Sequence, residues 1–155
     1  MRRLQLLIES ELHHVALMAM AVNKICSHFG MDEVEAYHVE LCVSEAVTNA
    51  IVHAYRGSPG NQISLVLEIE GDRLDLDFSD TGAPMRAEQA NRINHGLELA
   101  ERRSSEAATL PEGGRGLQIM RDIMDEVVYV REGQVNRLRM TKRLRPSQAH
   151  PPSLK

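Results

Sequence analysis

A chain of 155 residues is about the length of one domain, and its hydrophobic fraction of 43% is ordinary for a globular protein. The net charge of −4, the pI near 6.0 and the aromatic fraction of 3% disfavour a basic nucleic-acid-binding domain and one that stacks bases on aromatic rings. No apolar run approaches the roughly 20 residues of a membrane span, and Cys26 and Cys42 form no metal motif. We therefore expect a cytoplasmic protein that contacts neither nucleic acid nor membrane directly.

The first third of the chain predicts one strand and two helices. Alternation over residues 4–8 is a weak strand signal, and Ser10 precedes a helical period that ends near Gly30. Asp32 is the expected N-cap of a second helix, which runs to about Tyr55. A Gly/Pro-containing break follows at residues 57–60.

Hairpins dominate the rest of the chain. Alternating runs over residues 63–69 and 74–78 are joined by Gly71-Asp72, which predicts a tight hairpin. The periodicity is then lost from Thr81 to about Glu112, with room for a short helix within residues 88–102. A helix over residues 116–125 and a second hairpin, with strands at 127–130 and 135–140, complete the order.

This order of elements predicts an α+β fold. Most of the predicted strands belong to hairpins and the helices come in blocks, so we expect a two-layer sandwich with a mainly antiparallel sheet and helices on one face. Residues 1–142 form one domain in this interpretation. Residues 143–155 contain three prolines and no acidic residue, which indicates a flexible C-terminal tail.

Polar side chains recur every four residues on the second predicted helix. Glu45, Asn49 and His53 lie along one side of it, among Ala, Val and Ile neighbours. A carboxylate and a carboxamide cost free energy when they are buried without partners. The pattern is typical of a solvent-exposed stripe or of a functional site, and by itself it leaves both readings open.

A second cluster follows the first hairpin. Asp80 continues the alternation of Leu74, Leu76 and Phe78, which predicts that its carboxylate points toward the apolar face of the sheet. Gly82 allows a close approach of the backbone to a ligand, or a tight turn. An ordinary turn after a strand is the alternative interpretation.

A third cluster, Gly113-Gly114-Arg115-Gly116-Leu117, opens the later helix. Unpaired N–H groups and the helix dipole favour phosphate at such a position. The run matches neither the P-loop nor the dinucleotide-binding fingerprint, because no Lys-Ser/Thr follows and no strand directly precedes it. Alone it is a weak signal.

Together and in this order, the three clusters resemble the N box, G1 box and G2 box of the GHKL ATPase superfamily. Residues 44–50, followed by His53-Ala54-Tyr55, are similar to the N box of its anti-sigma-factor serine/threonine kinases, the RsbW and SpoIIAB type. Asp80-x-Gly82-x-Pro84 resembles the G1 box, with Pro84 where many members have a second glycine, and residues 114–117 resemble the G2 box. The resemblance covers roughly residues 1–142 and implies the Bergerat ATPase fold.

The resemblance implies a role for each matched residue. Asn49 would hold the Mg²⁺ that bridges the phosphates of ATP, and Glu45 would be the catalytic base toward the attacking hydroxyl. Asp80 would accept a hydrogen bond from the adenine amino group. Residues 81–113 would form the ATP lid. The remaining ATP-binding residues would be His53, Gly82, Pro84, Gly114, Arg115, Gly116 and Leu117, with a purely supporting role as the alternative for His53.

The same resemblance implies a function. It is that of a bacterial, cytoplasmic, homodimeric serine/threonine kinase and anti-sigma factor in a partner-switching pathway. Such a protein phosphorylates a STAS-domain anti-anti-sigma protein and sequesters a sigma factor. Two alternatives stay open: a nucleotide-gated binding protein without significant kinase activity, and a partner-switching kinase whose client is not a sigma factor.

Overall fold

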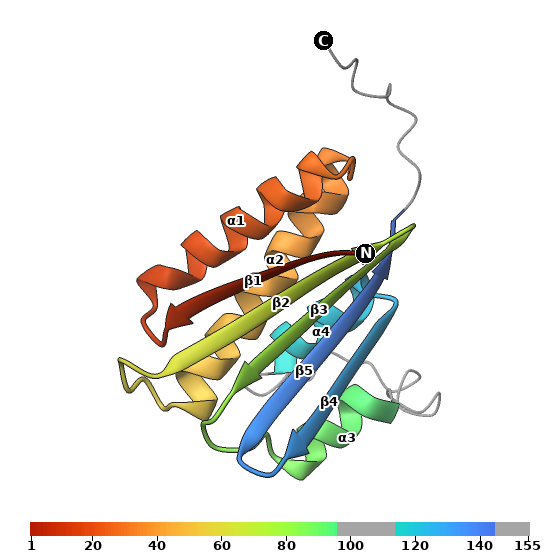
Figure 1. The fold of residues 1–155 in the computed structure, drawn as a ribbon. Helices are drawn as coiled ribbons and strands as arrows, with labels where there is room; N and C mark the ends of the chain where they lie inside the picture. Colours follow the sequence, from red (N-terminus) through yellow and green to blue (C-terminus); the bar gives the residue numbers. More distant parts are fainter. Residues whose placement is uncertain (96–113, 145–155) are drawn as a thin grey trace.

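The computed structural model describes residues 1–95 and 114–144, and all structural statements below concern these residues. The described chain forms one five-stranded antiparallel sheet with the strand order β1-β2-β3-β5-β4 (Figure 1). The prediction of an antiparallel α+β fold is confirmed. The strands are β1 Arg2–Glu9, β2 Gln62–Glu70, β3 Arg73–Asp80, β4 Glu126–Glu132 and β5 Val135–Arg143.

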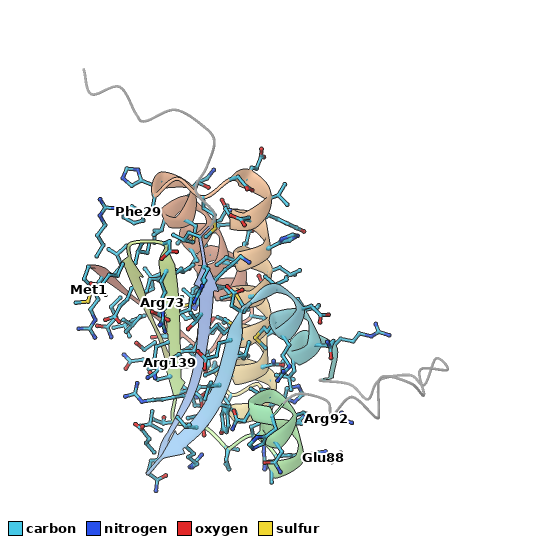
Figure 2. The ribbon with its side chains drawn as sticks, turned by 90° about the vertical axis from the view of Figure 1, so that its right-hand side faces the viewer. Met1, Phe29, Arg73, Glu88, Arg92 and Arg139 are labelled. Atoms are coloured by element: carbon cyan, nitrogen blue, oxygen red, sulfur yellow. The ribbon has the colours of Figure 1, made fainter. Side chains whose placement is uncertain are left out.

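The helices cover one face of this sheet, as predicted. Figure 2 shows them together on one side, while Arg73 and Arg139 project from the opposite, open face. No helix of the described residues has the length and apolarity needed to cross a membrane. The helices are α1 His13–His28, α2 Glu33–Asn49, the π-helical turn η1 Ala50–Ala54, α3 Ala87–His95 and α4 Gly114–Ile123.

The core lies between the sheet and the helices and is aliphatic. Leu67, Leu76 and Met140 are paired side by side across three strands and are almost fully buried. Burying such a side chain contributes about 1.5–3 kcal/mol each. Cys26 and Cys42 are free buried thiols of the same core, and burial raises the pKa of each to about 12.

The second helix ends near Tyr55 as predicted, but the hydrogen bonding of its last turn differs from that of an α-helix. The α-helical hydrogen bonding of α2 ends at Asn49, and the chain continues to Ala54 as a π-helical turn, in which the Tyr55 amide donates to the Ala50 carbonyl. Ser10 lies just before α1, and its hydroxyl makes no hydrogen bond to that helix. Its hydroxyl donates instead to the Ser58 carbonyl at 2.6 Å and anchors the break before β2.

The predicted lid and tail are described only in part. Within the aperiodic region, α3 is a helix whose Ile93 is buried. The Arg92 and Ile93 carbonyls of its last turn accept from the Arg121 guanidinium of α4. Residues 96–113 and 145–155 lie outside the described residues. The lid and the flexible tail therefore stay predictions.

Asp32 begins α2 as predicted, because its carboxylate accepts from the Glu35 amide at 2.8 Å. Asp32→Ala should lower the free energy of unfolding by about 1 kcal/mol through loss of this cap. Urea denaturation measures the change. Asp32→Asn is the matched control, since Asn caps about as well as Asp. Equal losses in the two variants would contradict the capping role.

Candidate functional site

A cavity of about 430 Å³ opens at the end of the sheet where β3 stops. Asn49 reaches it from the end of α2, His53 from η1, Asp80 from β3, Pro84 from the following loop and Leu117 from α4. The three clusters thus meet at one place, although up to 68 positions separate them in the sequence, from Asn49 to Leu117. Glu45, Gly82, Gly114, Arg115 and Gly116 do not line this cavity.

Asp80 presents a partly buried carboxylate to the cavity. Its Oδ1 accepts from the Gly82 amide at 2.9 Å and from the Asn136 side-chain amide at 2.7 Å, whereas Oδ2 has no hydrogen bond to any described residue. Burial raises the pKa of Asp80, and the hydrogen bonds from Asn136 and Gly82 oppose this rise. An ionised Asp80 is therefore a free acceptor for a ligand that donates a hydrogen bond.

Asn136 is a site residue that the motifs did not reveal. It lies on β5 directly opposite Asp80 on β3, and it is 3% exposed. Its side-chain oxygen accepts from Tyr129 Oη at 2.8 Å and from Arg131 Nη1 at 2.7 Å. We call these four residues, Asp80, Asn136, Tyr129 and Arg131, the Asp80 network. The alternation that singled out Asp80 also places Asn136 in phase with the buried Leu138, so this signal was available in the sequence.

Aromatic side chains contribute more to the cavity than the composition suggested. Two of the five, Phe78 and Tyr129, line it. The Tyr129 hydroxyl also accepts from the Met85 amide at 2.9 Å, which fixes the loop after β3 to β4. Tyr55 holds the start of the same loop, since its hydroxyl accepts from the Thr81 amide at 2.9 Å. The loop is therefore held at both ends by tyrosine hydroxyls.

Gly82 lies against the end of η1. A Cβ at this position would stand 2.6 Å from both the carbonyl carbon and the oxygen of Ala54. The next residue, Ala83, donates its amide to the same Ala54 oxygen at 2.8 Å. The close approach that Gly82 permits is thus one between two backbone segments that border the cavity.

Gly82→Ala should lower the free energy of unfolding by about 1–3 kcal/mol, because the added methyl meets rigid backbone and not a movable side chain. Chemical denaturation measures the loss. Thr81→Ser is the control from the same loop and should change stability by less than about 0.5 kcal/mol. Unchanged stability of the alanine variant would show that the contact with Ala54 is not tight in solution.

Glu45 lies outside the cavity, beside the first turn of α4. A Cβ on Gly116 would collide with the Glu45 carboxylate oxygen Oε2, so this glycine is what lets α4 approach α2 closely. Gly116, one of the two predicted G2 glycines, thereby lets the first turn of α4 lie against the predicted catalytic carboxylate. Arg115 is exposed on the same turn. Glu45 and the first turn of α4 thus lie together, and neither Glu45, Arg115 nor Gly116 lines the cavity.

The cavity also carries positive charge. Arg56 and Arg86 line it and are exposed, and neither was singled out in the sequence. Arg56 adopts a left-handed backbone conformation with φ of 53°, which is uncommon for a residue other than glycine. Two guanidinium groups near an acceptor carboxylate suit a ligand that carries both an anionic group and a hydrogen-bond donor.

Asn49 fits the role of a magnesium ligand. Its side-chain amide lines the cavity, and the buried Nδ2 has no hydrogen-bond partner among the described residues. A phosphate oxygen in the cavity would satisfy this donor, and the amide oxygen is a ligand that Mg²⁺ accepts. The described residues contain no cluster of three His, Cys, Asp or Glu side chains that would hold a metal ion by itself. When bound, the ion would neutralise phosphate charge.

A match to a known protein family defines the class of this protein. A family model described as the histidine kinase-like ATPase domain matches residues 8–142. The match covers most of the chain, so the chain belongs to this family. The matched range includes every element that builds the cavity.

Relatives within this class carry a more particular name. The serine-protein kinase RsbW of Listeria innocua is 27% identical over 132 residues, which are 84% of this chain and 82% of that protein. The serine-protein kinase RsbW of Bacillus subtilis is 27% identical over 125 residues, 80% of this chain and 75% of that protein. The protein of the same name from Bacillus pumilus is 28% identical over 127 residues, with the same coverage.

Solved structures agree on the fold. A structure of the RsbU and RsbW domains of a Mycobacterium tuberculosis protein has a TM-score of 0.65 at 15% identity and covers 95% of this chain. The histidine kinase domain of a blue-light activated histidine kinase from Erythrobacter litoralis has a TM-score of 0.53 at 19% identity and covers 86%. This chain spans 34% of the first neighbour's length and 60% of the second's.

Proposed function

We propose that the protein is an ATP-dependent serine/threonine protein kinase and anti-sigma factor of a partner-switching pathway. One observation carries the proposal: the cavity joins the acceptor carboxylate of Asp80 to the unpartnered amide of Asn49, and Glu45 lies just beyond it at the N-terminus of α4. A base acceptor, a metal ligand and a carboxylate base are the parts that phosphoryl transfer from ATP requires. The matching relatives that are named serine-protein kinases support the same reading.

Each residue has a defined task in this proposal. Asp80 accepts from the adenine amino group through Oδ2, and Asn49 holds Mg²⁺. Glu45 receives or orients the proton of the attacking Ser or Thr hydroxyl. The first turn of α4, Gly114 to Leu117, supplies backbone N–H groups and the charge of Arg115 to the phosphates. Pro84 and His53 border the bound nucleotide in this proposal, since both line the cavity.

The partners follow from the same class of protein. We propose that the phosphate acceptor is a Ser or Thr of a STAS-domain anti-anti-sigma protein, and that the sequestered client is a sigma factor. The protein would act as a homodimer in the bacterial cytoplasm, with residues 81–113 as the ATP lid. The exposed Leu7 of β1 and Leu17 and Met20 of α1 provide apolar surface for such a dimer.

A transfer assay tests the proposal. The protein is incubated with labelled ATP, Mg²⁺ and the STAS protein encoded nearest to it, and incorporated phosphate is located by mass spectrometry. Phosphate on a Ser or Thr of the STAS protein is the expected result. Without transfer to that protein, and without ATP binding, the proposal fails.

A nucleotide-gated binding protein is the second candidate function. The observation that favours it is the place of Glu45, which packs beside Gly116 and does not line the cavity. In this case ATP would change partner affinity, and no phosphate would move. Partner binding that differs between ATP and ADP, with no phosphorylated product, would select this candidate over the kinase.

A further inference from the structure

The buried amide of Asn136 makes five hydrogen bonds within the site. Nδ2 donates to Asp80 Oδ1 at 2.7 Å, to the Ala83 carbonyl at 3.1 Å and to the Gly82 carbonyl at 3.2 Å. Oδ1 accepts from Tyr129 and Arg131. A buried amide is costly unless its partners are in place, so five partners around one side chain constitute a built feature and not an accident of packing.

These bonds determine which way the Asp80 carboxylate faces. Oδ1 is engaged by two donors, the Gly82 amide and the Asn136 amide, and this leaves Oδ2 as the oxygen available to a ligand. The two carbonyls that Asn136 also binds belong to the loop that borders the cavity. One side chain therefore fixes both the acceptor and the loop beside it.

We infer that Asn136 is a positioning residue that holds the Asp80 carboxylate so that it only accepts hydrogen bonds from a ligand. Asn136 thereby makes the cavity select a base with an exocyclic amino group over a base with a carbonyl at the same position. The inference rests on the proposed function, since it presumes a purine nucleotide in the cavity. Asn136 acts through Asp80: its own polar atoms are already taken by protein partners.

The isosteric variant Asn136→Asp separates positioning from mere structural support. The new carboxylate still accepts from Tyr129 and Arg131, but toward Asp80 it can donate only when the pair holds a proton. Two carboxylates at hydrogen-bond distance do not both ionise readily, so the shared proton is lost as pH rises. The titratable or charged groups bonded to residue 136 are Tyr129 and Arg131 of β4, and His53, Arg56 and Arg86 line the same cavity. All of them are unchanged in the variant.

The experiment is a calorimetric titration with ADP, without metal, at pH 5 to 8. In the Asn136→Asp variant, ADP affinity should be close to wild type at pH 5 and at least about 10-fold weaker at pH 8, because the unprotonated pair repels. Wild type should show no such loss on going to pH 8. Inosine diphosphate, whose base carries a carbonyl in place of the amino group, donates no hydrogen bond to Asp80 from that position. Its affinity should therefore fall less than that of ADP between pH 5 and pH 8, and the preference of the variant for ADP should narrow at pH 8.

Each outcome has one reading. A wild type that fails to bind ADP contradicts the proposed function and leaves nothing for Asn136 to position. A wild type that binds ADP, with a variant of the same pH profile and the same preference for ADP over inosine diphosphate, overturns the inference alone. A uniform loss at every pH would assign Asn136 a structural role only, and this too overturns it.

A second measurement needs no variant. In ¹⁵N-labelled wild-type protein, the side-chain NH₂ signals of Asn136 should exchange with water more slowly than those of exposed Asn residues, and they should shift on addition of ADP. This result is expected if the amide stays bonded to Asp80 during nucleotide binding. Signals that exchange at the rate of exposed amides, or that do not respond to ADP, would overturn the inference even where Asn136→Asp does not fold.

Discussion

Glu45→Gln is expected to lower the rate of phosphate transfer by about 10²–10⁴-fold, because it removes a general base and keeps the shape of the side chain. ATP affinity should change by less than about twofold, since Glu45 does not line the cavity. Single-turnover transfer to the partner protein and a separate nucleotide titration give the two quantities. The kinase proposal requires that the transfer rate falls while the affinity for ATP stays unchanged.

Two further variants control this result. Glu33→Gln changes an exposed carboxylate in the first turn of the same helix and should leave the transfer rate near wild type. Gly116→Ala introduces a methyl where the Glu45 carboxylate now lies, so it should slow transfer by displacing a movable side chain. A Glu45→Gln protein that transfers phosphate at the wild-type rate would refute the assignment of the base.

Asp80→Asn is expected to weaken ADP and ATP binding by about 10- to 100-fold, which corresponds to the loss of one hydrogen bond to a charged acceptor. The oxygen of the new asparagine would still accept from the Gly82 and Asn136 amides. Its NH₂ group would then face the ligand, where it would meet the donor amino group of the base instead of accepting from it. Equilibrium titration measures the change. Asp77→Asn on the same strand is the control, because Asp77 lies on the open face with Arg137 and Arg139.

The pH dependence of the wild type gives the same prediction a second readout. Burial raises the pKa of Asp80 in the folded protein, so nucleotide affinity should decrease as pH falls through this raised pKa, whereas Asp80→Asn should show no such decrease. For the same reason the folded state binds this proton more tightly than the unfolded state, and the contribution of Asp80 to stability falls as pH rises from the unfolded pKa to the folded pKa. At neutral pH the unliganded variant should therefore be no less stable than wild type. If nucleotide affinity depended on pH in the same way in wild type and in Asp80→Asn, the role of Asp80 would be contradicted.

The regular elements could be predicted because their signals are local. The apolar period of α1 and α2 and the alternation in β2 and β3 each extend over one element, and the structure confirms both. Glycine marks the hairpin turns: Gly71 and Gly133 have φ of 59° and 61°, which other residues rarely adopt. Even the inward direction of Asp80 followed from a period of two along a single strand.

The π-helical form of the last turn of the second helix could not be predicted in this way. Its residues continue the apolar pattern, yet η1 replaces the last α-helical turn. This turn is in contact with a distant segment, since Gly82 and Ala83 approach the Ala54 carbonyl and the Thr81 amide donates to the Tyr55 hydroxyl. The apolar periodicity along one helix does not report contacts with segments more than 25 residues away in the sequence.

By itself, the sequence determined the class of fold, the order of elements and the three clusters from which we predict a nucleotide site. Only the tertiary structure decided how these clusters combine: Asp80 is aimed by Asn136 from a strand 56 positions away, and Glu45 lies beside Gly116 instead of inside the cavity. The physical reason is that periodicity reports which face of one element is buried. Hydrogen bonds and close approaches between elements depend on register and packing distance, and these exist only once the sheet and its helices have come together.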